Sequence, residues 1–300
     1  MKKIWKYRFY YYLALPGLIY FVIFHYVPMG GALIAFKDIS PFDGLQGFFD
    51  APWVGLKHFD RFTSSVYFYD VIQNTLIISG LKILFGFPAP IIFALLLNEV
   101  LRMNLKRVMQ TVSYLPHFIS WVVTAGMVTA LLATSGGLIT ESINDFTGSK
   151  INFLGNKDYF VGILVTSHVW KTIGWSSIIY LAAMSSIDPA LYESARLDGA
   201  NRLQMARHIT IPSIMFVIVI MLLLEIGNLL EAGFEQVLLL YSPSVYKVAD
   251  IIDTFVYREG LLALKYSFAA AVGLFKAVIA FFLLYTANRL ANRLGQTGLW

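Results

Sequence analysis

Six long apolar runs, separated by polar segments, dominate the pattern of this chain. A membrane-spanning helix needs about 20 mostly apolar residues, so each run is long enough to cross a bilayer. The runs lie at Phe9–Met29, Val71–Asn98, Val108–Thr134, Tyr159–Ile187, Ile209–Leu230 and Phe268–Leu290. The pattern predicts an all-α membrane protein with about six transmembrane helices. Aromatic residues after the first run predict short interfacial helices in the loop that follows it.

The amino-acid composition agrees with a protein embedded in a lipid bilayer. Hydrophobic residues make up 58% of the chain and charged residues 14%, whereas a soluble domain carries about a quarter charged residues. The absence of cysteine excludes disulfides and thiolate chemistry. His117 and His168 lack the spacing of a helical metal pair, so no metal site is predicted. The net charge of +5 is spread between the apolar runs, so nucleic-acid binding is not expected.

Positive charges set the expected orientation in the membrane. Lys2, Lys3, Lys6 and Arg8 precede the first run, which is too long for the core of a signal peptide and has no clean cleavage site after it. Lys and Arg are denser in the segments on this side than in the longer loops on the other side. Because Lys and Arg favour the cytoplasmic side, both termini are expected in the cytoplasm.

One membrane domain accounts for the chain, since no internal repeat or low-complexity tract divides it. Its expected parts are a first transmembrane helix with an external loop (residues 1–70), a transmembrane core (71–290) and a cytoplasmic tail (291–300). Within the core, residues 188–212 form a cytoplasmic segment between the fourth and fifth runs.

This cytoplasmic segment carries the most information. Asp188 is expected to cap a helix that begins at Pro189, where the missing N–H costs nothing. If that helix persists, apolar and small residues four apart form one narrow stripe. These residues are Leu191, Ala195, Gly199 and Leu203. Alternatively, Gly199 ends the helix in a left-handed conformation. The physical pattern alone fits a helix lying on the membrane surface equally well.

The same segment resembles the EAA loop of binding-protein-dependent ABC importer permeases. The matching stretches are Glu193-Ser194-Ala195, Asp198-Gly199-Ala200 and Ile209-Thr210-Ile211-Pro212. Ser194 replaces the first alanine of the family pattern, and Ile211 replaces its leucine. In this family the loop is a helix that couples the permease to a cytoplasmic ATPase. The resemblance implies that role for Glu193, Ala195, Asp198, Gly199, Ile209 and Pro212.

A second resemblance is independent of the first. The stretch from Trp53 to Phe59, followed by Asn74-Thr75-Leu76, is similar to the "VGL-x-N-F … NTL" pattern of maltose-type sugar permeases, with His58 in place of the asparagine. Three further stretches look like the polysaccharide-uptake branch of that family. They are residues 85–90, 113–117 and 233–236.

The resemblance implies a type I ABC importer transmembrane domain in the bacterial cytoplasmic membrane, moving an oligosaccharide by alternating access. It also implies three partners: a second homologous permease, a cytoplasmic ABC ATPase dimer and an external solute-binding protein. The chain has no Gly-x-x-x-x-Gly-Lys-Ser/Thr sequence, so it cannot hydrolyse ATP by the P-loop route. The chain is therefore expected to be no enzyme and to hold no cofactor, with ATP and Mg²⁺ on the partner ATPase.

Polar and aromatic residues within the runs are candidates for a substrate pathway. Ionisable residues at membrane depth mark such pathways, although an internal ion pair between Glu225 and a lysine is the alternative. Aromatic rings stack on sugars or pack between helices. The candidates are Lys82, Trp121, Lys171, Trp175, Glu225, Asn228, Glu231 and Lys276. Three lysines at this depth favour an acidic oligosaccharide, such as an alginate or pectin fragment.

Three alternatives remain at this point. The first is an importer permease for a non-sugar solute, such as a peptide or an amino acid. The second is a secondary transporter that needs no ATPase, for which inverted repeats with matching broken helices would be expected. The third is a membrane-embedded enzyme, which would need clustered acid, base or metal groups.

Overall fold

The computed structural model of the chain describes residues 7–40, 42 and 44–293. These residues form helices, turns and loops, with one isolated β-bridge between Lys37 and Trp53, which confirms the all-α prediction. Contacts divide the chain into two units. The first unit comprises residues 1–68 and 255–277, and the second comprises residues 69–254 and 278–300.

A long apolar helical stretch opens the first unit. It extends over Arg8–Phe36, 29 residues, and is apolar enough to cross a bilayer. None of the residues in its first part, α2, is buried, as suits a helix facing lipid or another chain. Its parts are α2 (Arg8–Phe21), a π-helical turn (Val22–Tyr26), α3 (Val27–Met29) and a 3₁₀ turn (Gly30–Phe36).

The loop after this stretch contains two short helices, as its aromatic residues predict. These are α4 (Gly44–Asp50) and α5 (Lys57–Thr63). The Lys37 ammonium donates to the carbonyl oxygens of Phe48 and Phe49 at 2.8 and 2.9 Å. A cation at the last carbonyls of a helix satisfies groups that have no partner within the helix, so Lys37 closes the end of α4.

Aromatic rings form the core of the first unit. Phe62 of α5 is 1% exposed and its ring centroid lies between 5.0 and 6.3 Å from those of Phe68, Phe255, Phe268 and Phe275. Three of these four contacts are edge-on, the arrangement that aromatic quadrupoles prefer.

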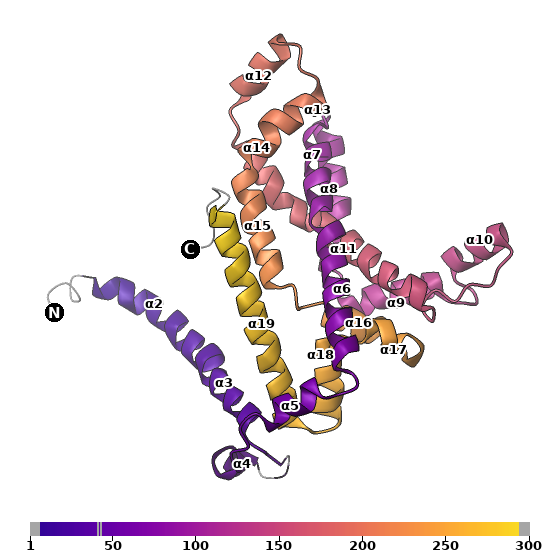
Figure 1. Cartoon of the computed structure of the whole chain (residues 1–300). Helices are drawn as coiled ribbons and strands as arrows, with labels where there is room; N and C mark the ends of the chain where they lie inside the picture. The colour runs from indigo at the N-terminus through magenta and orange to yellow at the C-terminus, as the bar shows by residue number, and fades with distance from the viewer. Residues whose placement is uncertain (1–6, 41, 43, 294–300) are drawn as a thin grey trace. The chain divides into compact units, whose positions relative to one another are not determined.

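The second unit holds most of the transmembrane core. Figure 1 shows α12 and α13 at one end of this unit and α16 and α17 toward the other. Its helices are α6 (Phe68–Gly86), α7 (Pro88–Asn98), α8 (Met103–Phe118), α9 (Trp121–Leu132), α10 (Leu138–Thr147), α11 (Lys157–Ser185), α12 (Pro189–Leu197), α13 (Arg202–Met205), α14 (Ile211–Ser213), α15 (Met215–Gly227), α16 (Phe234–Leu240) and α17 (Tyr246–Ala249). Two more helices are divided between the units, α18 (Ile252–Val256) and α19 (Tyr266–Arg293), and the first residue of α6, Phe68, belongs to the first unit.

Five of the six predicted spans correspond to helices, or bent pairs of helices, that are long and apolar enough to cross a membrane. Besides the first stretch, these are Phe68–Asn98, Tyr266–Arg293, the pair Met103–Phe118 with Trp121–Leu132, and the pair Arg202–Ser213 with Met215–Gly227. The remaining run corresponds to α11, whose 29 residues give a length of about 43 Å. Helix α11 is not among the helices whose length and composition suffice to cross a membrane, so its crossing stays a prediction.

Two spans are sharply bent, which the apolar pattern does not reveal. Helices α8 and α9 meet at 101°, and the helices on either side of Ile214 meet at 66°. A bend exposes backbone groups that need partners, because lipid offers none. At the first bend, Ser120 accepts a hydrogen bond from the Val123 N–H and so caps the start of α9.

Two apolar clusters hold the second unit together. One contains Ile78, Phe160, Leu164, Val237 and Leu240 and joins α6, α11 and α16. The other joins α7, α11 and the start of α15. Its buried members are Ala94, Tyr180, Met184 and Ile214. Helix α11 contributes to both clusters, so it is the central helix of this unit.

Candidate functional site

A polar cavity of about 170 Å³ lies among α6, α11 and the end of α15. Four of the predicted pathway residues line it together, although they come from distant parts of the chain. They are Lys82, Glu225, Asn228 and Glu231. The structure therefore brings half of the predicted pathway set to one place.

Helix α11 adds three polar residues to the cavity that the sequence analysis did not select as pathway residues. They are His168, Thr172 and Ser176. Because they are four residues apart, they lie on one face of the helix. This spacing was visible in the sequence, but only the packing of α11 shows that the face borders a cavity and not lipid.

Lys82 forms the buried wall of this cavity. Its side chain is 7% exposed, and its ammonium donates to the Ala232 carbonyl oxygen at 2.7 Å and to Gln236 Oε1 at 2.5 Å. Gln236 is fully buried. Its Nε2 donates to the carbonyl oxygen of Leu164 and to Ser167 Oγ, both at 2.8 Å. These bonds join α6, α11 and α16 through one polar network.

Gly233 makes room for this network. Its φ of +88° is left-handed, and a Cβ built at this position would lie 2.6 Å from Lys82 Nζ. A side chain here is therefore strained by the backbone conformation, and its Cβ would displace the ammonium. Gly233 also begins α16, which carries Gln236 three residues later.

Glu225 does not form the ion pair that the sequence left open. Among the described residues, no lysine nitrogen lies within 4 Å of its carboxylate. Its side chain is exposed at the cavity, as are those of Asn228 and Glu231. The two carboxylates and the amide are thus able to accept hydrogen bonds from a ligand in the cavity.

Lys171 lies at a different place and makes different contacts. Its ammonium donates to the carbonyl oxygens of Pro116, His117 and Ile119, at the end of α8. It also lies 5.4 Å from the ring centroid of Trp121. The Pro116 carbonyl oxygen also accepts from the Ile119 N–H, so Lys171 adds a donor there and supplies one to the carbonyls of His117 and Ile119. The contacts of Lys171 are those of a helix cap.

Aromatic rings gather at the same bend. Trp175 of α11 stacks on His117 with ring centroids 4.6 Å apart and planes 3° apart, and Phe118 meets Trp175 edge-on at 5.3 Å. Trp175 is 43% exposed and Phe118 is 69% exposed. The predicted aromatic candidates Trp121 and Trp175 thus both lie at the bend, where Phe118 and Trp175 are partly exposed.

Lys276 is not in the second unit. It belongs to the part of α19 that lies in the first unit and is half-buried. The structure therefore gathers seven of the eight predicted pathway residues in one unit, around the cavity and around the bend.

The segment 188–212, which is predicted to be cytoplasmic, forms the helix that its sequence predicts. Asp188 Oδ1 accepts a hydrogen bond from the Ala190 N–H at 2.9 Å, and α12 begins at Pro189. Gly199 has a φ of +79°, and the Ala200 N–H donates to the Ala195 carbonyl oxygen at 2.9 Å. Gly199 therefore ends the helix in the left-handed conformation.

This ending decides between the two alternatives for the segment. A single stripe that continues through Gly199 to Leu203 is wrong, because α12 ends at Leu197 and a separate helix, α13, begins at Arg202. Asn201 starts α13 with a reciprocal capping box with Gln204.

Exposed leucines surround this turn. Leu191, Leu197 and Leu203 are 50%, 90% and 78% exposed. The Tyr192 hydroxyl lies 2.9 Å from Thr210 Oγ1, which ties α12 to the helical stretch before α15. The segment is therefore a short rigid helix with an apolar surface, attached to the span that follows it.

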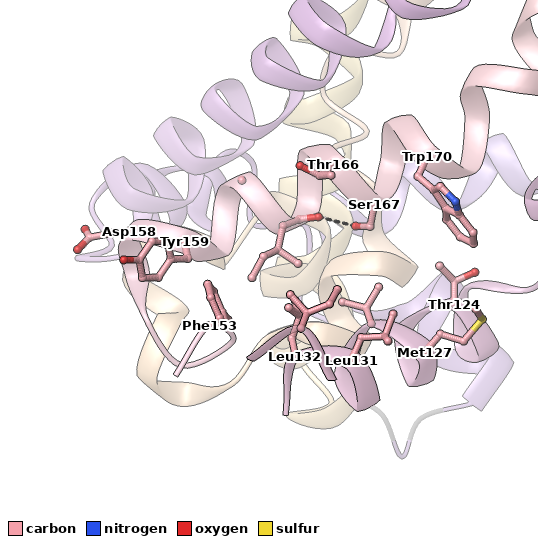
Figure 2. Close-up of a pocket in the computed structure, with 14 residues that line it drawn as sticks. Thr124, Met127, Leu131, Leu132, Phe153, Asp158, Tyr159, Thr166, Ser167 and Trp170 are labelled. Carbon is pink, nitrogen blue, oxygen red and sulfur yellow. Dashed lines mark hydrogen bonds between the residues drawn. The ribbon is translucent and has the colours of Figure 1, made fainter. Parts of the chain in front are cut away.

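A larger hollow of about 570 Å³ lies between α9 and α11 (Figure 2). Figure 2 shows Met127, Leu131 and Leu132 on one wall and Phe153 at one end. Ser167 donates to the Ile163 carbonyl oxygen at 2.5 Å and so does not offer its proton to the hollow. Walls of this kind suit hydrocarbon, whereas a sugar needs polar partners for its hydroxyls.

Bent and straight apolar helices around a polar cavity, with a rigid helix projecting at one end, define a membrane transport permease. The chain belongs to the family of binding-protein-dependent transport system inner membrane components, whose pattern matches residues 86–296. It is therefore a permease subunit of an ABC importer in the inner membrane, and not an enzyme.

Two relatives from Bacillus subtilis (strain 168) extend over almost the whole chain. The polygalacturonan/rhamnogalacturonan transport system permease protein YteP is 46% identical over 99% of this chain and 92% of its own length. Protein LplB is 43% identical over 97% of this chain and 90% of its own length.

Two solved structures have the same fold. One is the crystal structure of a bacterial ABC transporter involved in the import of the acidic polysaccharide alginate, with a TM-score of 0.90 and 42% identity over 97% of this chain and 98% of that one. The other is a bacterial alginate ABC transporter in complex with an alginate pentasaccharide-bound periplasmic protein, with a TM-score of 0.91 and 41% identity over 99% of both chains.

Proposed function

We propose that this chain is one of two related permease subunits of an importer for acidic oligosaccharides. The polar cavity at membrane depth carries this proposal, because it combines a buried ammonium at Lys82 with hydroxyl-binding groups at Glu225, Asn228 and Glu231. Similarity to permeases for polygalacturonan and alginate, both chains of acidic sugars, supports the same substrate class.

The aromatic residues at the bend between α8 and α9 form a second part of the pathway. Exposed faces of Phe118 and Trp175 offer stacking surfaces for sugar rings, which have apolar faces and polar rims. Lys171 holds this bend in place through the carbonyls at the end of α8. The bend thus positions the rings, and the cavity supplies the hydrogen bonds.

The cytoplasmic segment couples the permease to the ATPase. Helix α12 and the Gly199 turn form the docking surface, with the exposed leucines around it. Closure of the ATPase moves α12, and the contact between Tyr192 and Thr210 transmits that movement toward α15, whose end borders the cavity. The docking residues are Glu193, Ala195, Asp198, Gly199, Ile209 and Pro212. ATP and Mg²⁺ bind the partner ATPase in this scheme.

The complete importer contains four kinds of chain. This chain and a second permease form the passage, an ATPase dimer binds from the cytoplasm, and a solute-binding protein delivers the oligosaccharide from outside. Both termini of this chain lie in the cytoplasm, on the same side as α12.

Co-purification followed by reconstitution tests this function. The chain is purified in mild detergent from its native membrane, and the proteins that accompany it are identified by mass spectrometry. We expect a second permease and a P-loop ATPase. In liposomes, the assembled complex with the solute-binding protein should take up uronate oligosaccharides only when ATP is supplied on the ATPase side.

Two results would overturn the proposal. If the chain purifies alone and moves solute without ATP, it is a secondary transporter. If the complex takes up peptides or amino acids and no oligosaccharide, the importer class stands but the substrate class is wrong.

A further inference from the structure

Lys82 is a buried cation whose contacts are all with neutral groups. Its side chain is 7% exposed, and its two hydrogen-bond acceptors are the Ala232 carbonyl oxygen and the Gln236 amide oxygen. Within the described part of the chain, no carboxylate oxygen lies within 4 Å of Nζ. A buried charge is costly unless an opposite charge compensates it, so Lys82 lacks the partner that burial demands.

Lys82 and Lys171 differ in how many of their N–H donors already have an acceptor. A lysine ammonium has three N–H donors. Lys82 uses two of them for Ala232 and Gln236 and borders the cavity, which leaves one donor for a group inside it. Lys171 has three acceptors, the carbonyl oxygens of Pro116, His117 and Ile119. Of these two lysines, only Lys82 has a donor left for a substrate.

We propose that Lys82 binds a carboxylate of the oligosaccharide in this cavity and selects acidic over neutral sugars. This inference rests on the proposed function and assigns the recognition of charge to one residue. Gln236 and Gly233 are the positioning residues of the same site.

Gln236 holds the ammonium in a fixed position. Its Nε2 is tied to Leu164 and Ser167 on α11, so its Oε1 faces Lys82 and has no freedom to turn away. Gly233 leaves the space that the ammonium occupies, since a Cβ there would lie 2.6 Å from Nζ. The two residues thus fix the direction in which the remaining proton of Lys82 is presented.

The carboxylates of Glu225 and Glu231 border the same cavity and repel an acidic sugar, which opposes its attraction to Lys82. Both side chains are exposed, whereas Lys82 is buried. At equal distance, an interaction at an effective dielectric constant of about 20 is about fourfold stronger than one in water. A carboxylate in contact with Lys82 is therefore attracted more strongly than the solvated glutamates repel it. The glutamates are left to accept hydrogen bonds from sugar hydroxyls.

Equilibrium binding of two matched sugars tests the proposal. The complex of this chain with its partner permease and ATPase is purified, and the solute-binding protein is omitted so that it adds no selection of its own. The probes are a fluorescent uronate trisaccharide and the same trisaccharide with its carboxyl groups reduced to alcohols. We expect the wild-type complex to bind the uronate form at least tenfold more tightly than the reduced form.

Substitutions then locate the selectivity. Lys82→Met should bring the two dissociation constants within about twofold of each other, and Lys82→Arg should keep most of the preference. Gln236→Leu should lower the preference at least threefold, because the ammonium remains but is no longer oriented. Thr172→Val is the matched control, because it alters an uncharged residue of the same cavity. It should weaken the binding of both sugars equally and keep the ratio of their dissociation constants.

Each outcome has a separate meaning. If Lys82→Met keeps the tenfold preference, or the wild type binds both sugars equally, the role of Lys82 is overturned. If the wild type binds neither sugar while the complete importer with its solute-binding protein takes up uronate oligosaccharides, the role of Lys82 is overturned. If the complete importer takes up no oligosaccharide, the proposed function itself fails. Where Lys82→Met does not assemble, the double variant Lys82→Met/Gln236→Leu removes the cation and its acceptor together, and the same ratio is measured on it.

Discussion

Gly174 of α11 packs directly against the backbone of Ser113 on α8. A Cβ built on Gly174 would fall on the carbonyl carbon and oxygen of Ser113. Small residues at a crossing let two membrane helices approach closely, and here the approach is so close that not even a methyl group fits. Lys171, one turn earlier on α11, bonds the carbonyls at the end of the same α8 helix.

Gly174→Ala should destabilise this crossing. The added methyl meets backbone and not a flexible side chain, so the helices have to separate, at a cost of about 1–3 kcal/mol. Thermal unfolding of the purified complex measures the effect. Gly162→Ala on the same helix is the matched control, because nothing lies within 4 Å of its Cβ position. Equal unfolding temperatures for the two variants would contradict the close crossing.

Lys171→Met should destabilise the bend without changing which sugars bind. The carbonyls of His117 and Ile119 lose their donor, whereas that of Pro116 keeps the Ile119 N–H. Each buried acceptor left without a partner costs about 1–3 kcal/mol. We expect a lower unfolding temperature and weaker uptake, with the ratio between acidic and neutral sugars unchanged. Lys157→Met, at the exposed start of α11, is the control for loss of charge alone. A loss of selectivity at unchanged stability would place Lys171 in contact with substrate.

Gly199→Val should weaken association with the ATPase at least tenfold. Its φ of +79° strains a β-branched side chain by about 1–2 kcal/mol, although nothing within 4 Å obstructs a Cβ. Gly199→Asn, which tolerates this conformation, should stay within about threefold of wild type. Pull-down of the ATPase measures both variants.

Gly148→Val supplies the control for this experiment. Gly148 has a similar φ of +70° at the end of α10, in a segment that the charge pattern predicts to lie outside the cell. The Gly148→Val variant should introduce a similar local strain and leave the ATPase bound. If Gly148→Val also releases the ATPase, the effect of Gly199→Val reflects general destabilisation and not docking.

The loop after the first apolar helical stretch should loosen in acid. The Lys57 ammonium donates to Asp38 Oδ2 at 2.6 Å, and this hydrogen bond holds the pKa of Asp38 below its ordinary value of 3.8. A lowered pKa means that the contribution of Asp38 is complete above its ordinary pKa and is lost as the pH falls through the lowered value. The effect is small, since the two side chains are 46% and 60% exposed.

Protease sensitivity of the loop as a function of pH measures this effect. Sensitivity around residues 38–57 should rise below about pH 4 in the wild type. In Asp38→Asn it should be raised already at neutral pH and should not change with acid. A wild-type loop whose sensitivity stays constant down to pH 3 would show that the contact contributes nothing.

The sequence by itself determined the class of the protein and the helix α12. Apolar runs of about 20 residues have few alternatives to membrane helices, because lipid leaves no partner for unpaired backbone groups. Asp188, Pro189 and Gly199 act on neighbouring backbone, so their capping roles follow from local spacing and appear in the structure as α12.

Only the tertiary structure decided what each buried polar residue does. Lys82 and Lys171 look alike in sequence, since each is a lysine within a long apolar run. Packing places Lys171 at the end of α8 and Lys82 beside Gln236, 154 residues away, at the edge of a cavity. A polar group in a low-dielectric interior is defined by its partners, and partners that are distant in the chain meet only through the packing of helices.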